Sequence, residues 1–173
     1  MIIRCTDHRG FSLTELIATT ALISVVSGMS VPLLSSAASR SRSYGAMHDI
    51  AGQIRTARLA AVSTNRVMRI MFNCPGPGQY RVIEITGVAA IDDDANRCSY
   101  PWPDPAPGNL PDNDGPVMLL PQGIDFVATQ DLQIDAFGQI TPLAGGTPAQ
   151  IRVTDGTFAR QITVSTAGRI QLF

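Results

Sequence analysis

The stretch Arg9-Gly10-Phe11-Ser12-Leu13-Thr14-Glu15-Leu16 decides how the rest of the chain is interpreted. It leads into an uncharged run, residues 16–34, in which Leu, Ile, Val, Ala and Met predominate. With its apolar flank at 11–15, this run reaches the roughly 20 residues that a helix needs to cross a hydrocarbon layer. The short polar segment 1–10 carries Arg4 and Arg9, and basic residues before an apolar run keep that end in the cytoplasm. We therefore expect the C-terminal bulk across the membrane.

Glu15 is the residue that argues against two simple interpretations of the apolar run, a signal peptide and a plain membrane anchor. The small residues 36–38 offer a cleavage site for an ordinary secretory signal peptide, and a plain single-span anchor also contains an apolar run. Both interpretations accommodate Glu15 poorly, because a carboxylate at the centre of a membrane helix costs about 2.5–3.5 kcal/mol, and less near its end. An acid in this position indicates a functional role with a charged partner.

The quoted stretch resembles the processing site of type IV prepilins and type II secretion pseudopilins. In that superfamily a prepilin peptidase cuts after the glycine and methylates the exposed phenylalanine. The resemblance implies a leader at 1–10, cleavage between Gly10 and Phe11, and N-methylation of Phe11. Glu15 then becomes the fifth mature residue, where the family has its glutamate, and Pro32 takes the place of a helix-bending proline.

Physical reasoning on Glu15 agrees with this resemblance. Cleavage creates a positively charged amine at the edge of the bilayer, one helical turn from the Glu15 carboxylate. An ion pair between the two, within one chain or between neighbours, removes two desolvated charges from lipid together. Glu15 is therefore predicted to direct assembly with other pilin or pseudopilin subunits.

Residues 35–64 are expected to continue the helix as an amphipathic half. Apolar residues recur there at intervals of three and four, which is one face of a helix. The predicted helix extends from about Ser12 to about Ser63 and spans about 75 Å. Its first half, 11–34, is the transmembrane half. The apolar face is formed by Met47, Ile50, Ile54, Ala57 and Ala61.

The segment 65–173 is expected to form a β-rich periplasmic head, which makes the fold class α+β. Alternating apolar residues and turn residues predict antiparallel strands with one buried face. The Asp155-Gly156 and Ala167-Gly168 pairs supply the last two turns. Strands are expected at 67–72, 80–85, 117–120, 124–128, 132–134, around 151–153, around 162–164 and at 170–172.

Two further stretches resemble the minor pseudopilins of the GspH/FimT type. The first is 54–67, at the end of the helix and the start of the first strand. The second is Thr166-Ala167-Gly168-Arg169-Ile170, which is similar to that family's last hairpin. This resemblance implies a structural or initiating subunit of a type IV pilus or type II secretion pseudopilus.

Cys74 and Cys98 form an even pair in a head that should be periplasmic, since Cys5 belongs to the leader. A disulfide between them is the favoured interpretation, and two unpaired buried thiols are the alternative. Two cysteines without histidine partners do not make a zinc site.

The stretch 101–116 holds six of the twelve prolines, with Trp102, and is expected to be an exposed loop. It is either a surface insertion or a docking site for a neighbouring subunit. The acidic run Asp92-Asp93-Asp94 is expected to be a solvated turn; calcium binding is the alternative, but the acids do not follow an EF-hand order.

The 173 residues carry a net charge of −1, and all their basic side chains are arginine. No nucleophile–base–acid set is evident, so no catalytic residue, cofactor or metal is expected and the chain is predicted not to be an enzyme. DNA binding is the alternative function. Some relatives act as DNA receptors through a C-terminal Gly-Arg-x-Arg motif, of which Gly168-Arg169 supplies one arginine. Arg152, Arg160 and Arg169 are the candidate phosphate contacts.

Overall fold

The computed structural model covers residues 1–173 and describes all of them except 1–11, 95, 106–107 and 109–110. It divides into two compact units, Met1–Ser39 and Arg40–Phe173, and each is described by itself. The predicted processing residues Gly10 and Phe11 lie outside the described residues.

Helix α1 extends without a break from Leu13 to Thr64 and has Glu15 in its first turn. These bounds agree with the expected helix to within one residue at each end. Asn65 ends it with a φ of 54°, in the left-handed region that asparagine tolerates better than most residues. The Arg66 N–H then donates to the Ala61 carbonyl at 3.1 Å, which closes the last turn.

In the first unit, side-chain hydroxyls donate to the backbone of the helix itself. Thr20 Oγ1 donates to the Leu16 carbonyl at 3.0 Å, and Ser24 Oγ donates to the Thr20 carbonyl at 2.7 Å. These bonds satisfy the hydroxyls without an outside partner. Among the described residues, no helix combines the length and the apolar character required to cross a membrane.

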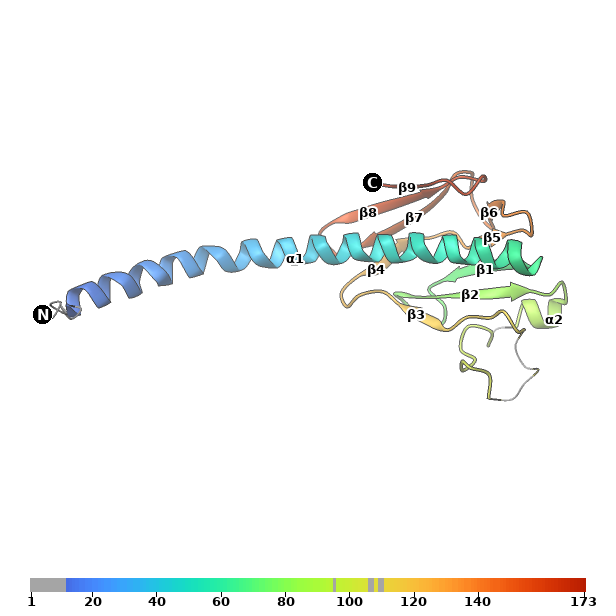
Figure 1. Ribbon diagram of the computed structural model, residues 1–173, viewed down its shortest axis with the longest axis horizontal. Helices are drawn as coiled ribbons and strands as arrows, with labels where there is room; N and C mark the ends of the chain where they lie inside the picture. Colours follow the sequence, from blue (N-terminus) through green and yellow to red (C-terminus); the bar gives the residue numbers. More distant parts are fainter. Residues whose placement is uncertain (1–11, 95, 106–107, 109–110) are drawn as a thin grey trace, which may run out of the picture. The chain divides into compact units, whose positions relative to one another are not determined.

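The second unit is built on the C-terminal half of α1. The predicted apolar face, Met47, Ile50, Ile54, Ala57 and Ala61, is completely buried in the core of the head. Two antiparallel sheets pack their apolar sides against it (Figure 1). The amphipathic pattern therefore predicted correctly which face of α1 packs on the β-rich head. The α+β fold class is confirmed.

The first sheet has five strands in the order β3-β2-β1-β5-β6. Neighbouring strands are antiparallel, and β1 pairs with β2 over its whole length, from Val67 opposite Ile85 to Phe72 opposite Tyr80. The bounds are β1 Val67–Phe72, β2 Gln79–Ile85, β3 Val117–Leu119, β5 Leu132–Ile134 and β6 Ile140–Pro142.

The second sheet has four strands in the order β4-β7-β8-β9, and its last three form the meander expected from the sequence. Ile151 and Val153 of β7 face the core beside Ile162 and Val164 of β8. The Ile140 N–H donates to the Thr166 carbonyl at 2.9 Å and connects the two sheets. The bounds are β4 Asp125–Ala128, β7 Ala149–Thr154, β8 Ala159–Val164 and β9 Ile170–Leu172.

Residues 86–116, called the lobe below, cover the face of β2 that is turned away from α1. The lobe begins with the short helix α2, Ala89–Asp92, and its described part contains no strand. As a result β2 is buried on both faces from Tyr80 to Glu84. The stretch 101–116 was expected to be an exposed loop, and this is wrong for its end. Asp114 is buried because Gly115 N–H donates to the Val82 carbonyl and holds the stretch along β2.

Candidate functional site

The N-terminal part of α1 presents large apolar side chains that its own unit leaves uncovered. Leu16, Ile17, Leu22, Ile23, Val25 and Val26 are each between 58 and 67% exposed. Glu15 lies at the start of this surface and is also exposed. Within the described residues, no cation lies at ion-pair distance from its carboxylate. This arrangement offers an apolar helix face with a single charge at its end.

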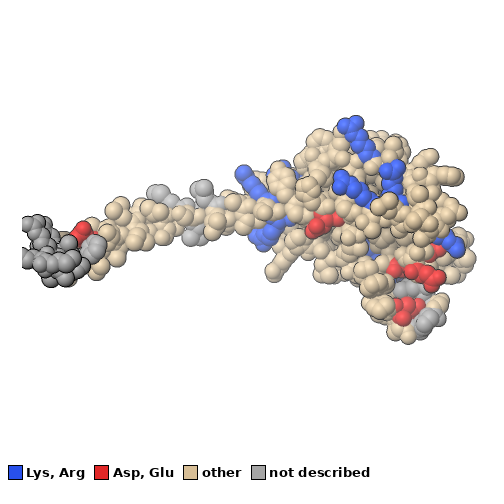
Figure 2. Space-filling view, viewed as in Figure 1, with Lys and Arg blue, Asp and Glu red and all other residues tan. Residues whose placement is uncertain are grey.

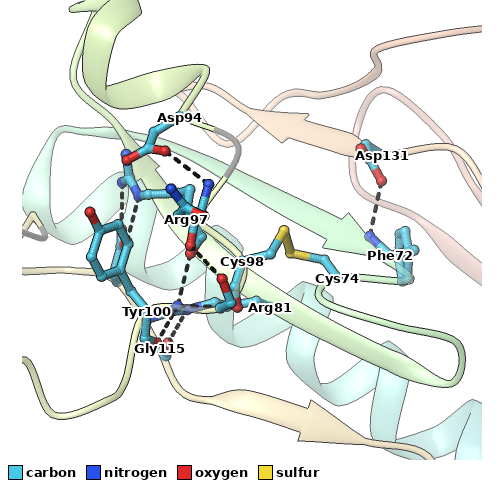
Figure 3. The surroundings of a disulfide bond; sticks show 12 residues. Phe72, Cys74, Arg81, Asp94, Arg97, Cys98, Tyr100, Gly115 and Asp131 are labelled. Atoms are coloured by element: carbon cyan, nitrogen blue, oxygen red, sulfur yellow. Dashed lines mark hydrogen bonds and ion pairs between the residues drawn. A yellow bond between two sulfur atoms is a disulfide. The ribbon is translucent and has the colours of Figure 1, made fainter.

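The disulfide between Cys74 and Cys98 is confirmed, with the two Cα atoms 5.2 Å apart (Figure 3). Cys74 lies in the turn between β1 and β2, and Cys98 lies in the lobe. The bond therefore attaches the lobe to the first hairpin of the head.

A buried arginine holds the lobe at a second point. Arg97 Nε donates to Asp114 Oδ2 at 2.7 Å, and Arg97 Nη2 donates to Asp114 Oδ1 at 2.8 Å. Arg97 Nη2 also donates to the Glu84 carbonyl of β2 at 2.7 Å. A bidentate arginine–carboxylate pair fixes orientation as well as distance. Arg97 thereby holds the C-terminal part of the lobe, at Asp114, against β2.

Arg81 of β2 is completely buried under the lobe and bonds to backbone carbonyls (Figure 3). Its Nε donates to Gly115 O at 2.8 Å, and its Nη1 donates to Arg97 O and Tyr100 O, each at 2.9 Å. Burial lowers the pKa of the Arg81 guanidinium, and the nearby Asp114 carboxylate opposes that shift. Arg81, Arg97 and Asp114 were not predicted from the sequence as structural residues, because no local pattern indicates their burial.

Asp92 is not the solvated residue that the sequence suggested. Its Oδ1 accepts hydrogen bonds from Thr86 N–H and Thr86 Oγ1, both at 2.9 Å, and its Oδ2 accepts from Gly87 N–H at 2.7 Å. Burial alone raises its pKa, but these hydrogen bonds outweigh burial and hold the pKa below its ordinary value. Within the described part of the chain, no three His, Cys, Asp or Glu side chains gather as a metal site. Asp92 closes the β2–α2 connection.

The three arginines proposed as phosphate contacts do not share one surface. Arg152 is exposed on the outer face of β7, where its Nη2 donates to Gln161 Oε1 at 3.1 Å, and Arg169 is exposed after the last turn. Arg160 pairs with core-facing Val153, and its guanidinium lies 4.3 Å from the centre of the Tyr44 ring on α1. Strand register thus turns Arg160 toward the helix, and the phosphate contacts of the three arginines stay a prediction.

Comparisons with known proteins now identify the family. The sequence model of the family described as type II transport protein GspH matches residues 46–168, more than half of the chain. The chain belongs to the GspH family. It is thus a member of the type IV pilin and pseudopilin superfamily, whose proteins are structural subunits of filaments.

The solved structures similar to this GspH-family chain include two crystal forms of the type IV minor pilin FimU from Pseudomonas aeruginosa strain PAO1. Each is 16% identical and covers 75% of this chain, with TM-scores of 0.47 and 0.48. The matches cover 91% and 87% of the two FimU chains. No curated protein sequence matches the chain.

The GspH match ends at Gly168, and the structure gives this glycine a packing role. Its φ is +80°, and a Cβ placed on it would come within 2.9 Å of the Arg58 guanidinium. Arg58 Nε donates to the Gly138 carbonyl at 2.8 Å, so this arginine of α1 lies under the turns of both sheets. In this GspH-family chain, a glycine at position 168 leaves space for the Arg58 side chain. This packing explains the glycine without any role in DNA binding.

Proposed function

We propose that this chain is a minor pilin or pseudopilin, a structural or initiating subunit of a type IV pilus or a type II secretion pseudopilus. The observation that carries the proposal is the uncovered apolar surface around the N-terminal part of α1, with Glu15 at its start, on a chain of the GspH family. A large uncovered apolar surface requires a partner. Packing of the same helices from neighbouring subunits supplies one in a filament.

Before assembly, the proposed location of the chain is the inner membrane, with one span at 11–34 and the head in the periplasm. The uncharged run 16–34 and the basic residues ahead of it support this location. The disulfide between Cys74 and Cys98 also suits an oxidising periplasm. After processing by prepilin peptidase, the subunit leaves the membrane for the filament.

The processing step is tested by Gly10→Ala in cells that contain the rest of the assembly machine. We expect the precursor to keep Met1 as its N-terminus, detected by mass spectrometry of the intact protein. Gly28→Ala is the matched control, because Gly28 lies within α1 and a Cβ there meets nothing within 4 Å. Normal removal of residues 1–10 from the Gly10→Ala chain would contradict the cleavage site.

The assembly step is tested by Glu15→Ala, which we expect to be cleaved but absent from sheared filaments. The physical reason for the expected loss of assembly is that the new amine at Phe11 no longer has the Glu15 carboxylate as its partner. Thr19→Ala is the control, because the Thr19 hydroxyl bonds only to the Leu16 carbonyl of its own helix. Normal incorporation of the Glu15→Ala chain would contradict the role assigned to this carboxylate.

DNA reception, the alternative function, is not favoured by a specific observation. Only Arg152 and Arg169 of its three arginines are exposed on the outer side, and Gly168 has a packing role. Gel-shift measurements on the chain with and without Arg169→Ala test this alternative. A shift that needs Arg169 at low salt would restore it.

A further inference from the structure

The head has a groove between the C-terminal half of α1 and the turns of the two sheets. Its volume is about 380 Å³, and Phe137 at its rim is 86% exposed and Leu59 70% exposed. The apolar lining comes from Ile54, Leu59 and Val62 of α1, Phe137 and Ile140 at β6, and Ile170 of β9. Ile54 and Ile140 are buried at the floor, whereas Leu59, Val62 and Phe137 face water. Three such side chains are not normally left exposed together unless the surface meets a partner.

The groove is also positively charged. Arg55 and Arg58 line it. Arg58 Nε is held by the Gly138 carbonyl, and among the described residues neither Arg55 nor Arg58 has a carboxylate within ion-pair distance. A partner suited to this groove therefore combines apolar side chains with carboxylates.

The lobe of the same chain has this composition. Val88, Ile91 and Trp102 are its exposed large apolar side chains, and Asp93 and Asp112 are exposed acids beside them. Trp102 Nε1 donates to the Asp114 carbonyl at 2.9 Å, so the half-exposed ring is held in one orientation. Figure 2 shows acidic side chains gathered on the lobe side of the head and arginines gathered elsewhere on it.

The groove and the lobe cannot meet within one molecule. The groove lies at the β6 edge of the five-stranded sheet, and the lobe covers β2, which is separated from β6 by β1 and β5. A second copy brings the two surfaces together and leaves one groove and one lobe unused at the ends of the pair. Such a head-to-tail contact repeats from copy to copy, and it builds a filament when its rotation does not close into a ring.

We propose that the heads of this chain associate head to tail, with the groove of one copy receiving the lobe of the next. The inference rests on the proposed function, because it names a partner surface for the assembling subunit. Apolar contact with Trp102 and Ile91 supplies burial, and Asp93 and Asp112 meet the arginines at the groove.

Cross-linking of the full chain in detergent tests the pairing. Two variants are made in a Cys5→Ser background, one with Ala167→Cys beside the groove and the other with Ala90→Cys beside Ile91 of the lobe, so that the side chains of the proposed contact are kept. They are then mixed and treated with a short thiol cross-linker. We expect a cross-linked pair that contains one of each variant. The control replaces Ala90→Cys with Arg152→Cys, an exposed residue on the outer face of β7, and should give no such pair.

Charge exchange provides the second measurement. We expect Arg55→Glu and Asp112→Arg each to weaken self-association several-fold, measured by analytical ultracentrifugation, and the chain that carries both changes to regain it. Circular dichroism and thermal unfolding of each variant confirm that the head is folded. Phe137→Ser is expected to weaken association about tenfold, because truncation at an interface core removes about 1.4 kcal/mol or more.

Several results would overturn the inference: a monomer at every concentration, cross-links only between identical positions, cross-links to a different subunit, or no recovery in the double-charge variant. The same variants are examined for removal of residues 1–10 and for filament incorporation of the unmodified chain. If these two properties are normal while association of heads is absent, the head-to-tail contact is wrong and the proposed function stands. If Gly10→Ala and Glu15→Ala also fail to behave as expected, the proposed function is wrong as well.

Discussion

At the scale of single residues, Arg97 should contribute most among the charged groups of the head. Arg97→Met removes the two guanidinium donors and the ion-pair partner of the buried Asp114 carboxylate, which keeps only the Glu84 N–H as a donor and the more distant charge of Arg81. An uncompensated buried charge costs about 3–5 kcal/mol, so we expect a fall of this size in the free energy of unfolding, measured by denaturant titration.

The matched control for Arg97 is Arg66, whose side chain is exposed and lies 3.6 Å from Glu84 Oε1. Arg66→Met should cost about 1 kcal/mol or less, because the Arg66 guanidinium is screened by solvent and the mostly buried Glu84 carboxylate keeps its hydrogen bond from Asn113 Nδ2. Asp114→Asn added to Arg97→Met should recover part of the loss, because it removes the buried charge. Equal costs for Arg97→Met and Arg66→Met would contradict the structural role of the pair.

Asp92 gives the head a pH dependence at acid pH. The hydrogen bonds from Thr86 and Gly87 keep its pKa in the folded state below the ordinary value of 3.8. The folded state therefore binds the proton less readily than the unfolded state does, and the stabilisation is present above pH about 4 and lost as pH falls further.

We expect Asp92→Asn to lower the free energy of unfolding by about 1–3 kcal/mol at pH 7, because the acceptor for Gly87 N–H is lost. The difference from the unmodified chain should shrink below pH 4. Asp93→Asn is the control, since Asp93 is exposed and should show neither effect. A pH-independent cost at Asp92 would mean that its charge is not responsible.

At the scale of elements, the Gly168 turn tests how α1 is joined to both sheets. Gly168 and Gly156 both adopt positive φ, +80° and +87°, but a Cβ meets Arg58 only at Gly168 and nothing within 4 Å at Gly156. Alanine at either position has the cost of the left-handed conformation, about 1–2 kcal/mol. Gly168→Ala must in addition displace Arg58.

We therefore expect Gly168→Ala to lower the thermal midpoint more than Gly156→Ala does. Arg58→Ala removes the guanidinium that the new methyl group would contact. In an Arg58→Ala background the two alanine substitutions should cost the same. If the difference between them persists there, the close approach of Arg58 is not its cause.

The C-terminal half of α1 and strands β7 and β8 were predictable because each buries a single face. Met47, Ile50 and Ile54 repeat at helical spacing, and Ile162 and Val164 alternate as in a strand with one buried side, so local pattern and packing agree. β6 was not predicted, because three residues that end in Pro142 are too few to show a period. The four residues of α2 gave no signal for the same reason.

The lobe could not be predicted, because it buries residues that a pattern assigns to solvent. Arg81 lies in β2 between apolar neighbours, and alternation puts such a side chain on the outer face. Its carbonyl partners come from Arg97, Tyr100 and Gly115, which follow it by 16 to 34 residues in the chain and which no local pattern places on that face. The pairing of Cys74 with Cys98 was the one contact of the lobe that the sequence indicated. It gave no indication that Arg97 and Asp114 are buried beside it. The orientation of Arg160 could not be predicted for a similar reason. It depends on the pairing of Arg160 with Val153 of the neighbouring strand, which the sequence of β8 alone does not determine.

At the scale of the whole molecule, the core is contained within residues 40–173. Every residue of the hydrophobic core lies between Ala46 and Val164, with Ile170 and Leu172 packed against it. The large apolar side chains at 16–26 take no part in this core and are exposed. The stability of the head should therefore not depend on the first unit.

Residues 40–173 alone should consequently unfold in one cooperative transition. Ile50→Ala should lower its free energy of unfolding by about 2–5 kcal/mol, since Ile50 is 1% exposed in the core. Leu22→Ala in the full chain should leave the unfolding of the head unchanged in denaturant titrations followed by Trp102 fluorescence. A loss of head stability on Leu22→Ala would show that the first unit contributes to the fold of the head.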